Sequence, residues 1–336
     1  MRTTIGLVAV TLTGLGVSAL MACGGDNPPP AAPTTTSAQT AAPPPVTPPP
    51  AETASAAPVT PPAPTAVFHL AGFQTPESVL WDDAADRYLV SNINGKPDAA
   101  DGNGYISDVS PDGKLTTEKW IEGGKNKVTL NAPKGTGITN GLLYVADLDN
   151  VRMFDVKTGA PKGNVKIPGA TFLNDIAIGA DGKVYVSDTG IKFTDKGPAP
   201  TGTDAVWMIE KNKATKVAKS KELHGPNGLL VGADGVWTVT FGAPELYRLD
   251  AKGAKQDVTK LPKGMLDGIV QLGDGSLLIS SWEDNGVYRG KPNGEFTEAF
   301  ANLKSPGRDR GGSARRPEHD DGKGEEAHAK SNVRNP

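Results

Sequence analysis

Residues 172–188 read FLNDIAIGADGKVYVSD, a phrase of two short apolar runs joined by Asp181-Gly182. The second run carries Val-Tyr-Val, the β-branched and aromatic composition that strands prefer, and Asp-Gly supplies the positive φ that a tight hairpin needs. Two further strand-like runs follow before the phrase is repeated. The predicted strands are 175–178, 183–188, 205–209 and 215–218. The stretch therefore predicts a four-stranded sheet, and no helical period is found in this region.

The phrase returns four more times between residues 67 and 304, and each copy begins with a polar residue at the same phase. The copies are PESVLWD…RYLVSN, APKGTGI…LLYVAD, GPNGLLVGADGVWTVTF and MLDGIVQLGDGSLLISS. The five polar positions, called the ring residues below, are Glu77, Lys134, Asn174, Asn227 and Asp267. Their spacings are 57, 40, 53 and 40 residues, and a base period of 40 is typical of a four-stranded propeller blade.

The two longer spacings contain inserts, at 94–103 and 192–203. Both inserts follow the second strand of a blade, so both loops are expected on one face of the ring, where binding loops usually gather. The predicted fold is therefore all-β, a β-propeller of four-stranded blades over residues 67–304, with five recognisable blades. An all-β sandwich is the alternative, but it gives no reason for polar residues locked to one phase of a 40-residue period.

The N-terminus is apolar from residue 5 to residue 22, which is typical of a signal peptide and too short for a membrane span. The run closes with the letters LMAC, which resemble a bacterial lipobox and imply cleavage before Cys23 and lipidation of its sulfur. The alternative is an ordinary secretory peptide with an incidental cysteine. We predict a lipoprotein signal peptide at 1–22 and a protein held at the membrane only by its lipid anchor.

Residues 23–66 are rich in Pro, Ala and Thr and predict a disordered tether, either a stalk or a linker without a selected length. The predicted location is the bacterial cell envelope, facing periplasm or exterior. Gly24 does not resemble the aspartate signal for inner-membrane retention, which favours the outer membrane or the surface. The net charge of −3 is well mixed, so nucleic acid is not an expected partner, and no protein partner is indicated.

Several repeat openings together resemble the senescence-marker-protein/gluconolactonase-like family. The motifs that carry the resemblance are PESVLWD at 76–82, LND at 173–175, PNGL at 226–229 and LDG at 266–268. The resemblance spans nearly all of 67–304. It implies a six-bladed propeller with a calcium ion at the mouth of its central channel, and hydrolysis of lactones in many members.

By this likeness Glu77, Asn227 and Asp267 match metal ligands, and Asn174 matches a position that contacts metal or substrate. The residue chemistry agrees, because calcium takes carboxylate and amide oxygens. We predict calcium, or another hard divalent cation, as the cofactor; a single cysteine and few histidines disfavour zinc and copper. Taken singly, the asparagines and Asp267 are ordinary turn residues, since Asn-Asp, Asn-Gly and Asp-Gly are common turn pairs.

Asp267 is the candidate catalytic residue, as general base or nucleophile beside a metal that polarises a carbonyl or phosphoryl oxygen. His224 could relay protons at the mouth, or be a hydrogen-bonded loop residue. Lys134 could contact an anionic group of the substrate; the interpretation we favour is a solvated turn lysine. Phe172 stands where sugar-lactonase members of the family place an arginine, so a ligand less polar than a sugar-acid lactone is expected.

The repeat breaks at residues 305–336. After Leu303 the only β-branched aliphatic residue is Val333 and there is no aromatic residue, so a buried sixth blade is not expected and the tail is predicted to be disordered. Our hypothesis is a frameshifted sixth blade, and a natural disordered tail is the alternative. Sequencing the locus distinguishes them: if no shifted frame encodes a strand-rich blade, the frameshift is rejected. Without that blade, the strand expected at 67–73 and the fifth blade would have unpaired edges.

The sequence thus predicts an envelope lipoprotein whose calcium-binding propeller hydrolyses a lactone or a related ester. Its expected partner is a small-molecule ester or lactone substrate. The alternative function is a non-catalytic propeller that binds a ligand or a protein on its loop face.

Overall fold

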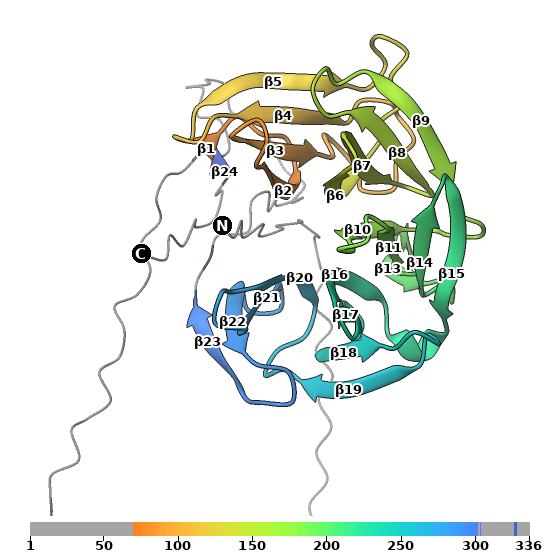
Figure 1. Ribbon diagram of the computed structural model, residues 1–336, viewed down its shortest axis with the longest axis vertical. Coiled ribbons are helices and arrows are strands. Elements are labelled where there is room, and N and C mark those ends of the chain that lie inside the picture. The colour runs from red at the N-terminus through yellow and green to blue at the C-terminus, as the bar shows by residue number, and fades with distance from the viewer. Residues whose placement is uncertain (1–69, 302, 304–325, 328–336) are drawn as a thin grey trace, which may run out of the picture. The chain divides into compact units, whose positions relative to one another are not determined.

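The computed structural model describes residues 70–301, residue 303 and residues 326–327 (Figure 1). The expectations for the signal peptide, for Cys23 and the tether, and for nearly all of the tail therefore lie outside the described residues. Within them the only helix is a single 3-10 turn, η1 (Lys221–Leu223), and all other regular structure is β-strand. No helix in this part of the chain is long and apolar enough to cross a membrane. The all-β prediction is confirmed.

Five four-stranded antiparallel sheets follow one another along the chain, each in sequential strand order. Blade 1 consists of β2 (Pro76–Asp82), β3 (Arg87–Asn92), β4 (Tyr105–Val109) and β5 (Leu115–Glu122). Blade 2 consists of β6 (Pro133–Thr139), β7 (Leu142–Asp147), β8 (Asn150–Asp155) and β9 (Pro161–Lys166). Blade 3 consists of β10 (Leu173–Ile178), β11 (Val184–Asp188), β14 (Ala205–Glu210), β15 (Lys213–Lys219). Blade 4 consists of β16 (Pro226–Gly232), β17 (Gly235–Thr240), β18 (Glu245–Leu249) and β19 (Lys255–Lys260). Blade 5 consists of β20 (Leu266–Gln271), β21 (Leu277–Ser281), β22 (Gly286–Gly290) and β23 (Phe296–Phe300).

The blades are arranged around an axis with their first strands innermost (Figure 1). Each of the inner strands β2, β6, β10 and β16 packs beside the inner strand of the next blade, and β20 is the last inner strand of this series. The fourth strands lie at the rim. This arrangement confirms the propeller and rejects the sandwich. Among the described residues there is no sixth four-stranded sheet between blade 5 and blade 1.

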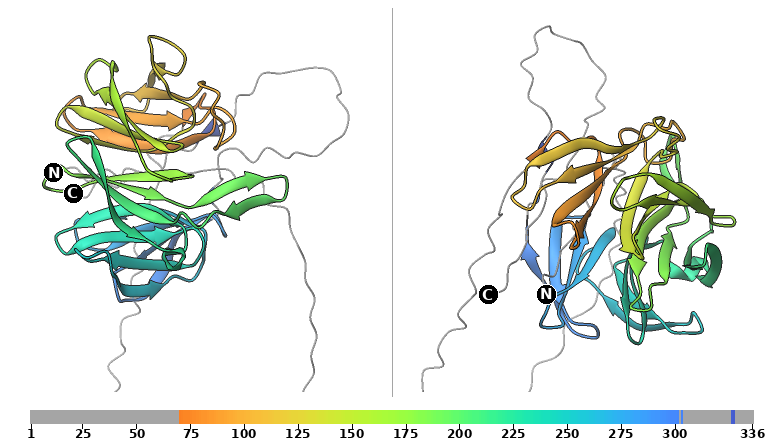
Figure 2. Two further views of the ribbon diagram at one scale, coloured as in Figure 1. Left: turned by 90° about the vertical axis from the view of Figure 1, so that its right-hand side faces the viewer. Right: turned by 45° about the horizontal axis from the view of Figure 1, so that its top comes forward.

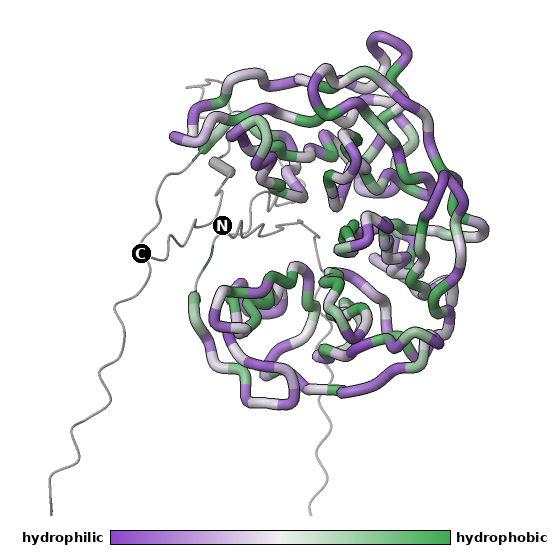
Figure 3. The backbone as a smooth tube through the Cα atoms, viewed as in Figure 1, coloured by the Kyte–Doolittle hydropathy of each residue, from purple (hydrophilic) through white to green (hydrophobic). Residues whose placement is uncertain are grey.

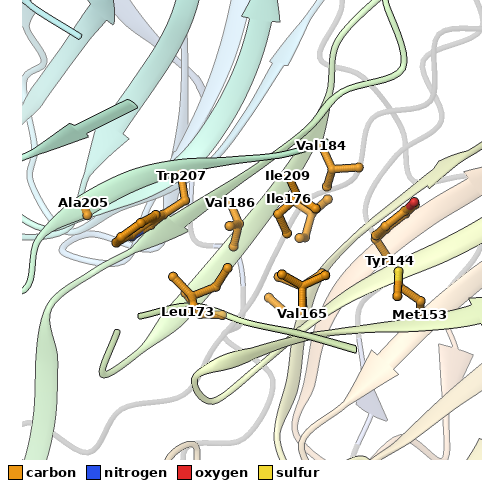
Figure 4. Packing of buried hydrophobic residues seen from close by; sticks show 13 residues of the cluster. Tyr144, Met153, Val165, Leu173, Ile176, Val184, Val186, Ala205, Trp207 and Ile209 are labelled. Carbon is orange, nitrogen blue, oxygen red and sulfur yellow. The ribbon is translucent and has the colours of Figure 1, made fainter. Parts of the chain in front are cut away.

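Apolar side chains fill the space between consecutive blades. Between blades 2 and 3, Tyr144 and Met153 pack with Leu173, Ile176 and Trp207 (Figure 4). Removing one such large side chain from water contributes about 1.5–3 kcal/mol to folding. Rim strands such as β9 and β19 are mostly hydrophilic, and apolar and polar segments alternate along the chain (Figure 3). The alternation is the pattern expected of blades that bury both faces near the axis and meet water at the rim.

Both inserts follow the second strand of a blade, as the repeat predicted. The first connects β3 to β4. The second, expected as a loop, contains a hairpin of β12 (Ile191–Thr194) and β13 (Gly197–Pro200), which stands out beyond the strands of its blade (Figure 2). A two-stranded hairpin tolerates its two prolines because each strand has an outer edge that needs no partner.

The N-terminal strand ends two residues earlier than expected, and residues 67–69 of the expected strand lie outside the described residues. It is β1 (Leu70–Ala71), and it pairs antiparallel with β24 (Glu326–Ala327) in the tail, with Leu70 opposite Ala327. The expected unpaired N-terminal edge is thus occupied at these two residues. In the fifth blade, β23 is the outermost strand.

Candidate functional site

All five ring residues occupy the second position of an inner strand. These residues are at most 7% exposed, although each is polar or charged. The alternative of ordinary turn residues is therefore wrong, because these residues lie inside strands β2, β6, β10, β16 and β20. An identical register in five blades places the five side chains at equivalent points around one axis.

A break in strand pairing occurs at the same place in every blade. The first residue of each inner strand is in register with the end of the second strand, and regular pairing resumes only after the ring residue. In blade 4, for example, Pro226 pairs with Thr240 and the next paired residue is Leu229. Such irregularities re-aim a side chain that regular pleating would direct into the neighbouring blade.

The glycine that follows a ring residue allows the inner strands to approach closely. A Cβ on Gly228 would lie 2.2 Å from the backbone oxygen of Asp267, and a Cβ on Gly135 would lie 2.5 Å from the Cα of Asp175. Only a residue without a side chain fits at either position. The Asn-Gly pair of blade 4, which resembles a turn, is thus required by the contact between blades.

Acidic residues at the end of the second strand hold the segment that leads into the inner strand. In blade 2, Asp147 Oδ1 accepts a hydrogen bond from the Ala132 backbone N–H at 2.9 Å. In blade 3, Asp188 Oδ1 accepts one from the Phe172 N–H at 3.0 Å. Both carboxylates are completely buried. Each ring residue of these blades therefore follows a segment whose backbone is fixed by a charge-assisted hydrogen bond.

Glu77 is a buried carboxylate without hydrogen bonds. Neither of its oxygens has a partner among the described residues, and both are inaccessible to water. Burial raises the pKa of Glu77 well above its ordinary value, and the negative charges of Asp267 and Asp175 raise it further, whereas Lys134 opposes them. These neighbours come from blades 5, 3 and 2, so charged groups far apart in sequence meet around Glu77.

The interpretation of Lys134 as a solvated turn lysine is wrong. Its side chain is completely buried. The ammonium donates to the carbonyl oxygens of Pro97 at 2.9 Å and Ala132 at 3.1 Å, and lies 4.2 Å from the centre of the Phe172 ring. Burial lowers the pKa of Lys134 to about 8, although Glu77 favours its charged form. Two carbonyls and an aromatic face thus replace water around this cation.

Asp267 is held at both of its carboxylate oxygens. Asn227 Nδ2 donates to Oδ1 at 2.9 Å, and Trp282 Nε1 donates to Oδ2 at 3.0 Å. Asn227 Nδ2 also donates to the backbone oxygen of Leu266 at 3.0 Å. Asn227 and Asp267 therefore contact each other directly across the boundary between blades 4 and 5. The sequence did not point to Trp282, and no short-range motif marks it.

Asn174 is anchored from its own blade. Its Nδ2 donates to Thr189 Oγ1 at 3.1 Å, and Thr189 in turn donates to the backbone oxygen of Pro226 at 2.9 Å. The amide nitrogens of Asn174 and Asn227 are both committed as donors. Their amide oxygens are consequently the atoms with which they can bind a cation.

Asp175 is a charged group that sequence reasoning missed. It is partly buried, and its Oδ2 accepts a 2.8 Å hydrogen bond from the Leu229 N–H of the next blade. Burial raises the pKa of Asp175 to about 6. The available signal was its place beside Asn174, but an Asn-Asp pair also resembles a turn.

The contacts described for two other predicted residues, Phe172 and His224, are with groups other than Glu77 and Asp267. Phe172 is 4% exposed, contacts Lys134 as described and packs on Phe193 of the hairpin at 5.6 Å between ring centres. His224 Nδ1 hydrogen-bonds Glu245 Oε2 at 3.0 Å, and Glu245 also binds the ammonium of Lys255 at 2.6 Å. These are the contacts of a hydrogen-bonded loop residue, the alternative left open for His224.

The donors around the ring fit a hard cation in kind. They comprise carboxylates and amide oxygens, with no sulfur or imidazole, which suits calcium and not zinc. No group of three or more His, Cys, Asp or Glu residues within the described ranges is placed to hold a metal. Any cation here would therefore rely on Glu77 and Asp267 together with the neutral oxygens of Asn174 and Asn227.

Comparisons with known proteins agree on the fold. No family model matches the sequence, and no curated protein resembles it closely enough to be matched. Among solved structures, a gluconolactonase from Xanthomonas campestris superposes with a TM-score of 0.52 at 15% identity, covering 72% of this chain and 80% of that chain. A structural-genomics target described as a candidate gluconolactonase gives 0.52 at 17% identity, covering 72% and 82%. The structural neighbours thus include gluconolactonases, and the chain has a propeller fold of the lactonase type.

Proposed function

We propose that the ring residues hold one divalent cation, calcium by the chemistry of the donors, in a hydrolase that acts on a lactone or a related ester. The observation that carries this proposal is Glu77, whose buried carboxylate has no hydrogen bond and faces the negative charge of Asp267. A buried carboxylate is strongly unfavourable unless a proton, a counter-charge or a metal neutralises it. The gluconolactonase-type fold supports the same function.

The charges around Glu77 support a divalent ion. Glu77, Asp267 and Asp175 would bring three negative charges when ionised, and Lys134 brings one positive charge. The resulting charge of −2 is the charge that a divalent cation balances. The two ring carboxylates, Glu77 and Asp267, are the only charges that the sequence-based interpretation considered. They also sum to −2, because the charges of Asp175 and the buried Lys134 cancel.

The roles of the chain's own residues follow from their contacts. When bound, a calcium ion polarises the carbonyl oxygen of an ester or lactone. Asp267 is held in one orientation by Asn227 and Trp282. We propose that Asp267 takes the proton of an attacking water, so that the ester opens to an acid and an alcohol. In the alternative, Asp267 attacks the carbonyl carbon itself, which releases the alcohol and forms an acyl-enzyme that water then hydrolyses to the acid.

The envelope location remains part of the proposal. It rests on the LMAC motif ending at Cys23 and on the Pro-rich segment that follows. An acyl anchor and a tether would hold the propeller near the membrane surface.

The proposal is tested with the full-length chain purified in detergent. Calcium at tenfold excess over its dissociation constant is expected to stabilise the protein by about 1.4 kcal/mol, seen as a higher melting temperature. A panel of lactones and aryl esters is expected to show calcium-dependent turnover. Asp267→Asn is expected to lower that turnover at least about a hundredfold, because an amide cannot take a proton in its place. Turnover that persists in Asp267→Asn contradicts the assignment.

One observation favours a second candidate, a propeller that binds a ligand without hydrolysing it. His224, the one histidine within the described ranges, is committed to Glu245 and supplies no proton relay at the ring. A calcium-dependent rise in melting temperature without turnover of any lactone or ester in the panel would support this candidate.

Lys134→Met tests the electrostatics of the ring. It removes the positive charge that opposes the raised pKa of Glu77, so the calcium-free protein is expected to lose about 3 kcal/mol of stability at pH 7. Calcium is expected to restore more stability to this variant than to the wild type, measured by chemical denaturation with and without the ion. Lys166→Met, at an exposed lysine paired with Asp149, is the control and is expected to change stability by less than about 1 kcal/mol. Equal losses in the two variants would contradict the role of Lys134.

A further inference from the structure

A second repeated position lies directly after the second strand of each blade. Its occupants, called the collar below, are Ile93, Leu148, Thr189, Phe241 and Trp282. Four of the five are apolar or aromatic. The collar therefore contrasts with the ring, where every residue is charged or an amide.

Backbone hydrogen bonds fix the collar beside the ring in four blades. The collar N–H donates to the carbonyl of the residue two places before the ring residue of the same blade. The pairs are Ile93 to Thr75, Thr189 to Phe172, Phe241 to Gly225 and Trp282 to Met265, at 2.9–3.1 Å. In blade 2 the corresponding carbonyl, that of Ala132, accepts from the Lys134 ammonium.

Side-chain contacts show that the two positions touch. Trp282 Nε1 donates to Asp267 Oδ2, and Asn174 Nδ2 donates to Thr189 Oγ1. Both pairs join a collar residue to the ring residue of its own blade. The other blades share the register, so their collar residues are placed next to their ring residues as well.

The partly exposed collar residues are apolar. Leu148, Phe241 and Trp282 are half-buried, whereas Ile93 is completely buried. Phe241 packs edge-on against Trp282, with ring centres 6.2 Å apart. Trp282 uses its one polar atom on Asp267, so it presents only carbon to other groups. These side chains offer no hydrogen-bond donor or acceptor to a hydroxyl group.

We propose that the collar selects a lactone or ester with an apolar alkyl or aryl substituent, and rejects a polyhydroxylated sugar lactone. This inference rests on the proposed function of the ring. The reacting carbonyl would meet the polar ring, and the substituent would contact Phe241 and Trp282. Hydroxyl groups in that place would lose water without gaining hydrogen bonds, which disfavours their binding.

The test compares the full-length protein on γ-butyrolactone, on its alkyl-substituted homologues and on gluconolactone. We expect kcat/KM to rise about two- to fourfold for each added methylene, as for transfer of a CH₂ group from water. Phe241→Ala is expected to remove this dependence of kcat/KM on chain length. Val258→Ser, at an exposed residue on the rim strand β19, is the control and is expected to keep the dependence.

A binding measurement tests ligand binding by the collar independently of hydrolysis at the ring. Alkyl lactones are expected to change the fluorescence of Trp282 on titration, and Trp282→Phe is expected to lose that change, whereas Trp81→Phe on blade 1 keeps it. Binding of alkyl lactones without turnover would contradict the proposed hydrolysis and support the proposed selectivity of the collar. Turnover of gluconolactone as fast as that of the alkyl lactones would contradict the proposed selectivity of the collar and support the proposed hydrolysis. Absence of both binding and turnover would overturn both.

Discussion

Glutamine in place of Glu77 is expected to abolish the calcium-induced rise in melting temperature and, at the same time, to make the calcium-free protein more stable. The carboxylate is buried without hydrogen bonds, so its charge opposes folding when no cation is present. Removing the charge should raise the free energy of unfolding without calcium by about 1–3 kcal/mol. Chemical denaturation with and without calcium measures both effects.

The pH dependence provides a check on the same substitution. Because the pKa of Glu77 is raised in the folded state, the folded protein binds the proton more tightly than the unfolded chain does. Calcium-free wild type is therefore expected to lose stability as the pH rises from about 4.3, the ordinary pKa of glutamate, through the raised value. Glu77→Gln should show a weaker dependence, with the remainder due to Asp175, whose pKa is raised to about 6. An unchanged calcium response in this variant would contradict the assignment of Glu77.

Alanine in place of Gly228 is expected to separate the inner strands of blades 4 and 5. The added Cβ would lie 2.2 Å from the backbone oxygen of Asp267, so one strand has to move. Overpacking of this kind costs about 2–3 kcal/mol of stability. The same movement displaces Asp267 relative to Asn227, so calcium affinity should fall together with stability.

Gly294→Ala is the matched control for this prediction. Gly294 lies in the turn before β23, where the nearest atom to a new Cβ is the Lys291 oxygen at 3.2 Å, and its substitution should cost less than about 1 kcal/mol. Denaturant unfolding and calcium titration of both variants measure the difference. If Gly228→Ala matched the control in both measurements, the close approach of the inner strands would not matter for the site.

The ring of polar positions could be predicted from the sequence because it depends on the repeat. Strand composition, Asp-Gly turns and a period of 40 residues together determine which residue of each blade faces the axis. Asn227 and Asp267 were predicted this way, and they contact each other in the structure although they are 40 residues apart. A period is visible in the sequence even when each single motif resembles a turn.

Lys134 and Asp175 show what the repeat does not reveal. The burial of Lys134 depends on the Pro97 carbonyl from an insert and on the face of Phe172 from the next blade, contacts that no sequence pattern displays. Asp175 is stabilised by a backbone N–H of blade 4, which is likewise a tertiary contact. The hairpin in the second insert was missed because its prolines argue against strands, although an edge position tolerates them.

Terbium luminescence tests most directly whether the ring holds a cation, because terbium replaces calcium at oxygen sites and is excited by a nearby tryptophan. Trp282 donates to Asp267, so an ion bound at the ring would lie next to its indole ring. We expect sensitised emission that saturates at one terbium per chain, is displaced by calcium and is largely lost in Trp282→Phe. Emission that is absent at one equivalent, or unaffected by Trp282→Phe, would contradict a cation at the ring.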